Sequence, residues 1–189
     1  IACVNTDWWH DGRLVEITFQ YMELYSIIPA NIGDLDRLQI IRLTGNQLKG
    51  EIPNSILNLP NIQVLKLNSN SLIGNIPDSI GLLIDLDTLW LNNNQLSGGI
   101  PQRIFSLDGL QDLRLDNNDL DGSISENLGD LSSIQYLRLD NNNLSGGIPQ
   151  SIGNLINLRR LYLLNNNLSD QIPESICTIY ANNENFRSY

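Results

Sequence analysis

The chain has 189 residues, of which 41% are hydrophobic, so it holds enough apolar material for one folded domain and is not an intrinsically disordered chain. Its formal net charge of −10 argues against a general affinity for nucleic acid or anionic lipid, because both require a cationic surface. No apolar run approaches the roughly 18 to 20 residues that span a bilayer, and no basic segment followed by an apolar one opens the chain.

From Leu14 onward the sequence repeats itself with a period of 24 residues, and the repeat runs through seven copies. One column of the repeat is asparagine in six copies: Asn46, Asn70, Asn94, Asn118, Asn142 and Asn166. Another is isoleucine in all seven: Ile28, Ile52, Ile76, Ile100, Ile124, Ile148 and Ile172. A fixed period without insertions predicts a solenoid of stacked coils rather than a globular fold.

Each unit begins with an alternating segment such as Leu137-x-Leu139. A period of two residues predicts a strand whose leucines point into the coil and whose intervening residue, here Arg138, points outward. Stacking the units then places these strands side by side in one parallel sheet.

A sharp turn follows each strand and leaves backbone donors and acceptors facing the interior. A buried asparagine side chain carries both a donor and an acceptor, so the asparagine column is predicted to satisfy these groups within its own coil and the next. Glycine then recurs where a positive φ or a close approach is needed, at Gly50, Gly74, Gly98, Gly122 and Gly146. An Ile-Pro pair sends the chain along the outer face in a short helical or extended stretch, with Ser125 replacing proline in one copy.

The unit L-x-x-L-x-x-L-x-L-x-x-N-x-L-x-G-x-I-P-x-x-I resembles the plant-type leucine-rich repeat and covers residues 14–178. Proteins with such repeats include ectodomains of plant receptor kinases, polygalacturonase-inhibiting proteins and secreted bacterial proteins. The resemblance implies an α/β repeat solenoid, a right-handed superhelix with a parallel β-sheet on the concave face and short helical or irregular convex segments.

The two ends are predicted to close this single domain. Residues 1–13, in the stretch "CVNTDWWHDGRLVEITF", resemble the N-terminal cap of the family and lead into a first strand at residues 15–19. We expect Trp8, Trp9 and His10 to cover the open end of the core. Residues 179–189 are interpreted as the start of a C-terminal cap, in which Phe186 closes the other end.

The only two cysteines, Cys3 and Cys177, fall at opposite ends of the predicted solenoid. They cannot form a disulfide with each other, because a disulfide needs Cα atoms within about 7 Å. Either both are free buried thiols, or each pairs with a cysteine outside this stretch. The cysteines therefore leave the redox compartment open.

The outward positions of the strands form three columns on the predicted concave face. The central column reads Thr18, Arg42, Lys66, Trp90, Arg114, Arg138 and Tyr162. The column two residues earlier reads Glu16, Ile40, Val64, Thr88, Asp112, Tyr136 and Arg160, and the column two residues later reads Gln20, Thr44, Asn68, Asn92, Asp116, Asp140 and Leu164.

Basic and aromatic residues gather on these strands although the chain as a whole is acidic. Six of its eleven basic residues lie there, and aromatic and arginine side chains are the types that most often anchor protein interfaces. The predicted partner-binding residues are Arg42, Lys66, Trp90, Arg114, Tyr136, Arg138, Arg160 and Tyr162. Trp90 in particular is expected to be exposed in the middle of the sheet.

A simpler interpretation is that Arg114 and Arg138 only neutralise Asp112, Asp116 and Asp140 in exposed pairs of little energetic value. A calcium site at Asp116 and Asp140 is a further alternative, since hard oxygens gather there. The neighbouring arginines disfavour it, and no metal site is predicted.

The function we expect is non-enzymatic extracellular recognition, in which the concave sheet binds a protein or peptide. Carbohydrate or cell-wall binding is an alternative, with Trp90, Tyr136 and Tyr162 stacking on sugar rings. A structural ectodomain fragment of a larger receptor or adhesin is a third.

Catalytic residues and cofactors are not predicted, because the sequence has no metal-ligand cluster, phosphate-binding glycine loop or recognisable nucleophile, and His10 is its only histidine. The expected location is secreted or cell surface, with the cytoplasm left open.

Two tripeptides match the acceptor sequence for N-glycosylation, Asn143-Leu144-Ser145 and Asn167-Leu168-Ser169. In a secreted eukaryotic protein both are candidates to carry sugar. The alternative is that the repeat pattern itself produces them.

Overall fold

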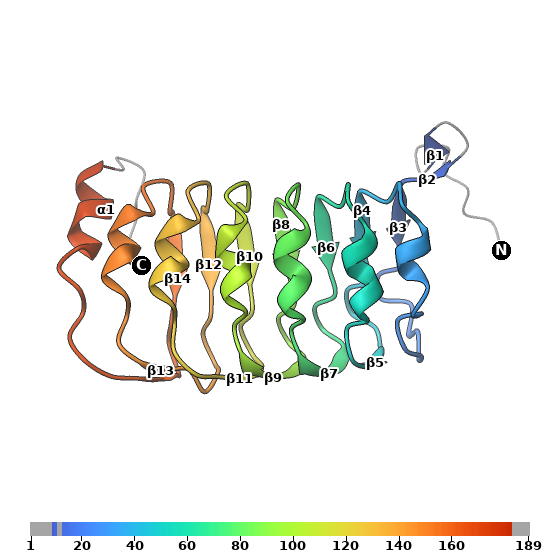
Figure 1. The fold of residues 1–189 in the computed structure, drawn as a ribbon. Helices are drawn as coiled ribbons and strands as arrows, with labels where there is room; N and C mark the ends of the chain where they lie inside the picture. The colour runs from blue at the N-terminus through green and yellow to red at the C-terminus, as the bar shows by residue number, and fades with distance from the viewer. Residues whose placement is uncertain (1–8, 11–12, 183–189) are drawn as a thin grey trace.

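The computed structural model describes residues 9–10 and 13–182, which form an elongated solenoid (Figure 1). The short strands of one sheet line one long side of the coil, and short helices line the opposite side. The predicted α/β leucine-rich repeat solenoid is confirmed. Trp8 and Phe186 lie outside the described residues, as do Cys3 and the side chains of Trp9 and His10, so the predicted lid and C-terminal closure stay predictions.

The main sheet has seven parallel strands in the order β14-β12-β10-β8-β6-β4-β3, and we call it the concave sheet. Its strands are β3 (Glu16–Thr18), β4 (Ile40–Arg42), β6 (Val64–Lys66), β8 (Thr88–Trp90), β10 (Asp112–Arg114), β12 (Tyr136–Arg138) and β14 (Arg160–Tyr162). Every pair is in register at an offset of one repeat, as in Leu113 opposite Leu137. The first strand is therefore shorter than the predicted residues 15–19.

A second strip of parallel strands runs along another side of the coil, and we call it the lateral sheet. It consists of β5 (Lys49–Gly50), β7 (Ser71–Asn75), β9 (Gln95–Gly99), β11 (Asp119–Asp121), β13 (Ser145–Gly146) and β15 (Asn167–Leu168). A single bridge between Ser123 and Ser145 links its two parts. Near the N-terminus, β1 (Trp9–His10) pairs antiparallel with β2 (Arg13–Leu14).

The outer side carries one short 3₁₀ helix per repeat, which confirms the helical alternative for these segments. The helices are η2 (Ile32–Asp34), η3 (Asn54–Asn58), η4 (Asp78–Leu82), η5 (Gln102–Ser106), η6 (Glu126–Asp130) and η7 (Gln150–Asn154), and α1 (Ile176–Asn182) follows them. Most begin directly after the proline of the Ile-Pro pair, whose fixed φ suits a helix start. Ser125 replaces that proline before η6, and its hydroxyl accepts a hydrogen bond from the N–H of Asn127.

The interior is a column of leucine and isoleucine side chains closed off by the predicted asparagine ladder. In the concave strands, Leu89, Leu113 and Leu137 are fully buried. The amide of Asn118 donates to the carbonyl of Leu91 at 3.1 Å and to that of Leu115 at 3.0 Å, while its oxygen accepts from the N–H of Leu96 at 3.0 Å. The ladder thus ties each coil to the one before it.

In runs such as Asn92-Asn93-Asn94, each asparagine has a different structural role. Asn92 is buried beneath the strand, Asn94 belongs to the ladder, and Asn93 between them adopts φ 55°. Asparagine tolerates this left-handed conformation better than most residues, so the turn uses it repeatedly. The glycine that follows also has positive φ, as predicted, for example 73° at Gly98.

The last repeat departs from the others. The isoleucine column is buried from Ile28 to Ile124, but Ile172 is 71% exposed. Cys177 is exposed with a free thiol, so its interpretation as a buried thiol is wrong. It lies on α1, on a side that no later coil of the described chain covers.

Candidate functional site

The concave sheet brings the predicted partner-binding residues into two neighbouring columns. Thr18, Arg42, Lys66, Trp90, Arg114, Arg138 and Tyr162 lie directly opposite one another on successive strands. Tyr136 pairs with Arg160 in the adjacent column. Because parallel strands lie about 4.8 Å apart, each side chain in a column is within reach of its neighbours on the strands before and after it.

Trp90 is held between two cations at the centre of the sheet. The ammonium nitrogen of Lys66 lies 3.4 Å from its ring centroid and the guanidinium carbon of Arg114 lies 3.9 Å from it. Cations over the face of an indole are attracted by its π electrons. Trp90 is accordingly half-buried, and the expectation of an exposed tryptophan is wrong, because its neighbours in the column cover both faces.

The indole N–H of Trp90 is buried and has no acceptor among the residues that the structure describes. A buried donor without a partner costs about 1 to 3 kcal/mol. The contacts that the structure gives for Trp90 are those of its ring with Lys66 and Arg114. The group is therefore held by its column neighbours rather than by a hydrogen bond.

Of the two cations that stack on Trp90, Arg114 has an ion pair, whereas Lys66 forms none with a residue that the structure describes. Burial lowers the pKa of its ammonium, the positive charge of Arg42 lowers the pKa further, and the carboxylate of Asp112 raises it. Both main effects disfavour the charged form. An anionic group placed beside Lys66 would therefore relieve an unfavourable environment.

Two of the arginines are paired with acids of the column beside them. Arg42 donates to Glu16 at 2.6 Å, and Glu16 also accepts from the hydroxyl of Thr18. Arg114 makes two parallel bonds to Asp112, at 3.0 and 2.9 Å. Such fork-to-fork contacts fix the plane of a guanidinium, and here they hold the guanidinium of Arg114 over the indole.

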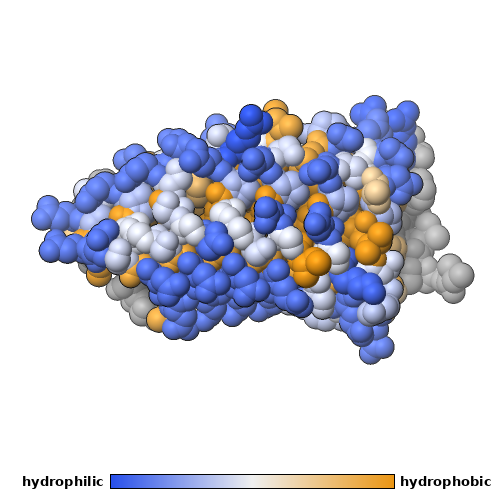
Figure 2. Space-filling model, turned by 60° about the horizontal axis from the view of Figure 1, so that its bottom comes forward, coloured by the Kyte–Doolittle hydropathy of each residue, from blue (hydrophilic) through white to orange (hydrophobic). Residues whose placement is uncertain are grey.

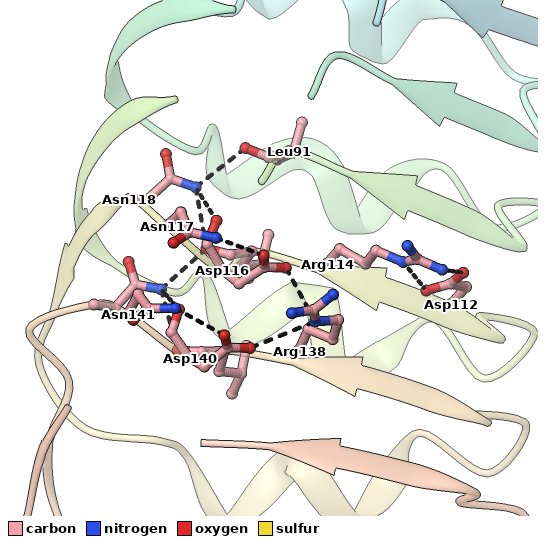
Figure 3. A network of polar contacts seen from close by, with 12 residues as sticks. Leu91, Asp112, Arg114, Asp116, Asn117, Asn118, Arg138, Asp140 and Asn141 are labelled. Atoms are coloured by element: carbon pink, nitrogen blue, oxygen red, sulfur yellow. Dashed lines mark hydrogen bonds and ion pairs between the residues drawn. The ribbon is translucent and has the colours of Figure 1, made fainter. Parts of the chain in front are cut away.

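Arg138 lies between two buried acids from successive repeats (Figure 3). Its Nε is 3.6 Å from Asp116 and 3.5 Å from Asp140, whose side chains are only 2% and 8% exposed. The neighbouring amides of Asn117 and Asn141 each donate to one of these carboxylates at 2.8 Å. The guanidinium occupies the space where a cation bridging the two acids would sit.

These contacts confirm that Arg114 and Arg138 neutralise Asp112, Asp116 and Asp140, but not in the exposed form that the sequence suggested. The third column, which was expected to face the hollow, is largely buried: Thr44 is 5% exposed, Asn68 8%, Asn92 8%, Asp116 2% and Asp140 6%. The strands end at the central column, and the chain then turns through a residue of positive φ such as Asn117. The turn tucks the side chain at this position beneath the arginine column.

We expect Asp116→Asn to leave the protein equally or more stable at neutral pH. Burial raises the pKa of the Asp116 carboxyl, an effect that the charge of Arg138 opposes. The folded state then binds more protons than the unfolded state between the ordinary pKa and the raised one, so stability falls as the pH rises through that window. Asparagine does not titrate, and it already occupies this column at Asn68 and Asn92.

Urea unfolding between about pH 3.5 and 7.5 tests this, since the linkage appears only where the carboxyl titrates. The variant should gain stability relative to the parent as the pH rises. Asp119→Asn, at an exposed position, serves as the control for removing one negative charge. Parallel stability profiles for Asp116→Asn and the parent would contradict the expectation.

The C-terminal part of the sheet adds two further cation and aromatic contacts. The guanidinium of Arg138 lies 4.8 Å from the ring centroid of Tyr162, and that of Arg160 lies 5.9 Å from that of Tyr136. Tyr162 is 38% exposed and Arg160 is also exposed. This end of the sheet therefore offers more accessible side-chain surface than the stack around Trp90.

The side chains that stack along the concave sheet are chiefly cations and aromatic rings. The described residues contain no group of three or more His, Cys, Asp or Glu side chains that could hold a metal ion. Across the same residues, the helices are too short or too polar to cross a membrane. What the concave sheet offers is a row of oriented cations and aromatic rings, which suits contact with a partner surface.

Comparison with known proteins places the repeat in a family. The family model described as Leucine Rich Repeat matches six segments, residues 37–59, 61–83, 85–107, 109–131, 133–155 and 157–179. A search of curated protein sequences returned no match.

Solved structures of receptors are similar to this chain along most of its length. The plant peptide hormone receptor RGFR1 in complex with RGF2 is 35% identical over 86% of this chain, with a TM-score of 0.85. PEPR1 with AtPEP1 is 33% identical over 98%, with a TM-score of 0.86, and the Arabidopsis receptor kinase HAESA with the peptide hormone IDA and the co-receptor SERK1 is 34% identical over 89%, with a TM-score of 0.82. The chain spans only 26%, 25% and 28% of these three structures, respectively.

Proposed function

Because this chain belongs to the leucine-rich repeat family, we propose that it is a non-enzymatic recognition module that binds a protein or peptide through its concave sheet. The observation that carries the proposal is the column in which Lys66, Trp90, Arg114, Arg138 and Tyr162 stack in register. Rigid aromatic and arginine side chains contribute most of the energy at protein interfaces. Their stacking and ion pairs also lower the entropy lost on binding.

The solved relatives support a peptide or protein as the partner. RGFR1 is a peptide hormone receptor seen with RGF2, and HAESA is seen with a peptide hormone and a co-receptor. This chain shares their fold over most of its length but covers about a quarter of theirs. We therefore propose an extracellular location. The second candidate function is a structural role as part of a larger receptor-like ectodomain. The division into a cap at residues 1–13, seven repeats over 14–178 and a second cap from 179 belongs to the same proposal.

Carbohydrate binding receives less support from the geometry. A sugar ring stacks on the free face of an aromatic side chain, but Lys66 and Arg114 cover both faces of Trp90. Tyr136 and Tyr162 each have an arginine over the ring as well. A glycan ligand would have to displace Lys66 or Arg114 before it could stack on Trp90.

The proposal predicts that Trp90→Ala and Tyr162→Ala weaken partner binding at least tenfold, or about 1.4 kcal/mol, without a large loss of stability. A partner captured from extracellular extract on the immobilised protein supplies the ligand, and calorimetric titration supplies the Kd. Thermal unfolding of each variant separates lost binding from lost folding.

Tyr25→Ala is the matched control, because Tyr25 also has a cation over its ring, Lys49 at 4.4 Å, but lies off the concave sheet. Its affinity should equal that of the parent. Unchanged affinity in both concave variants would remove the concave sheet as the binding site.

A further inference from the structure

We propose that Asn143 and Asn167 are N-glycosylation sites and that their sugars cover the C-terminal part of the lateral sheet. This inference rests on the proposed extracellular location, because the modification occurs in the secretory pathway. The two acceptor tripeptides are Asn143-Leu144-Ser145 and Asn167-Leu168-Ser169. The structure adds three observations that the tripeptides alone do not supply.

The first observation is that both tripeptides present their acceptor residues to solvent. Asn143 and Ser145 are exposed on either side of Leu144, which is fully buried. Asn167 and Ser169 are exposed in the same way around Leu168. The leucine packs into the core of the coil, while the asparagine and serine on either side of it, which the modification requires, point to solvent.

A second observation concerns the bonds that a sugar would disturb. The backbone N–H of Asn143 donates to Leu120 and that of Asn167 donates to Leu144, so the main chain is already fixed. Neither side-chain amide makes a hydrogen bond with any residue that the structure describes, in contrast to the ladder amides of Asn142 and Asn166. Attaching a sugar to Asn143 or Asn167 therefore breaks no side-chain hydrogen bond to a residue that the structure describes.

The third observation is that the repeat does not impose these tripeptides. The positions equivalent to Asn143 in the four preceding repeats are Gln47, Ser71, Gln95 and Asp119. Those equivalent to Ser145 are Lys49, Ile73, Ser97 and Asp121. Only the central leucine is required by the core, so the asparagine and serine of the two acceptor tripeptides are not products of the repeat pattern.

The position of the two sites keeps sugar away from the concave sheet. In the lateral sheet Ser145 lies opposite Asn167, so the two acceptor asparagines are on adjacent coils about 8 Å apart, one strand spacing and two residues along. The lateral and concave sheets lie on different sides of the coil (Figure 1).

The other end of the lateral face is different in character. Figure 2 shows this face, with apolar residues more prominent toward the N-terminal end. Ile27 is 57% exposed and Ile73 is 47% exposed there. Sugar at Asn143 and Asn167 would therefore cover the opposite end of the same face and leave this apolar region bare.

The test is to direct the chain through the secretory pathway of eukaryotic cells with an added signal peptide and to measure its intact mass before and after peptide N-glycosidase treatment. The parent should carry two glycans, Asn143→Gln and Asn167→Gln one each, and the double variant none. Ser145→Thr should keep its glycan, because threonine also completes the acceptor tripeptide, whereas Ser145→Ala should lose it.

Gln95→Asn is the matched variant that gains a site, because with Leu96 and Ser97 it creates a third Asn-Leu-Ser tripeptide. It should add a third glycan, because Gln95 is exposed on the same edge of the lateral sheet. Secreted parent protein without sugar at either asparagine would overturn the proposal, and sugar at one only would overturn it for the other.

This experiment is independent of the binding proposal. Bacterially produced protein carries no glycan and tests the concave sheet by itself. Glycosylated protein that binds no partner would leave the two sites established and remove only the proposed function.

Discussion

Replacing Asn142 with alanine is expected to lower the free energy of unfolding by about 2 to 5 kcal/mol, because it leaves several buried backbone groups without partners. The amide of Asn142 donates to the carbonyls of Leu115 and Leu139 at 3.0 and 3.1 Å, and its oxygen accepts from the N–H of Leu120 at 3.0 Å. Each unpaired buried group costs about 1 to 3 kcal/mol, and the solvent reaches little of this site. Urea denaturation followed by circular dichroism measures the loss.

The next residue provides a matched control. Asn143 has the same side chain but is exposed, and its amide has no hydrogen bond to a described residue. Asn143→Ala should change the free energy of unfolding by less than about 0.5 kcal/mol. Similar losses for the two variants would mean that the ladder hydrogen bonds do not stabilise the coil.

The fold was predictable from the sequence because each column of the repeat meets one local structural requirement. Leu137 and Leu139 must face inward, Gly146 must adopt positive φ, and Asn142 must meet backbone groups that a turn leaves unpaired. None of these requirements depends on a contact distant in sequence, apart from contacts with the preceding coil. The ends were less predictable, since Ile172 follows the pattern and is nevertheless 71% exposed.

The candidate site was predictable in its residues but not in its burial. Alternation correctly placed Lys66, Trp90 and Arg114 in one column, but it also assigned Asp116 to the surface. That residue comes after the strand has ended, where the period of two no longer holds. The sequence offered one usable signal, because Asn117 and Asn141 follow directly and asparagine favours the left-handed turn that moves the side chain inward.

Burial of the two acids changes what Arg138 does. On an exposed face the pairs would contribute about 0 to 1 kcal/mol. With the acids 2% and 8% exposed, the guanidinium is instead needed to keep two buried carboxylates paired. The same residue thus joins the proposed binding column to the stability of the coil beneath it.

We therefore expect Arg138→Met to lower the free energy of unfolding at pH 7 by about 2 kcal/mol. Removing one partner of a fully buried pair costs about 3 to 5 kcal/mol. The value here is smaller because the side chain of Arg138 is 34% exposed and solvent screens its charge. Methionine keeps an apolar stem beside Tyr162, so the change isolates the loss of charge.

The loss should shrink as the pH falls toward about 4, because burial raises the pKa of the Asp116 carboxyl and the charge of Arg138 opposes that rise. Without the guanidinium, Asp116 gains its proton in the folded state before it does so in the unfolded state. Adding Asp116→Asn and Asp140→Asn to Arg138→Met should restore most of the stability, since the uncompensated charges are then gone. Arg160→Met, which removes an exposed cation with no ion pair among the described residues, should cost less than about 0.5 kcal/mol. A pH-independent loss in Arg138→Met, or no recovery in the triple variant, would show that Arg138 does not stabilise the coil by pairing with the buried acids.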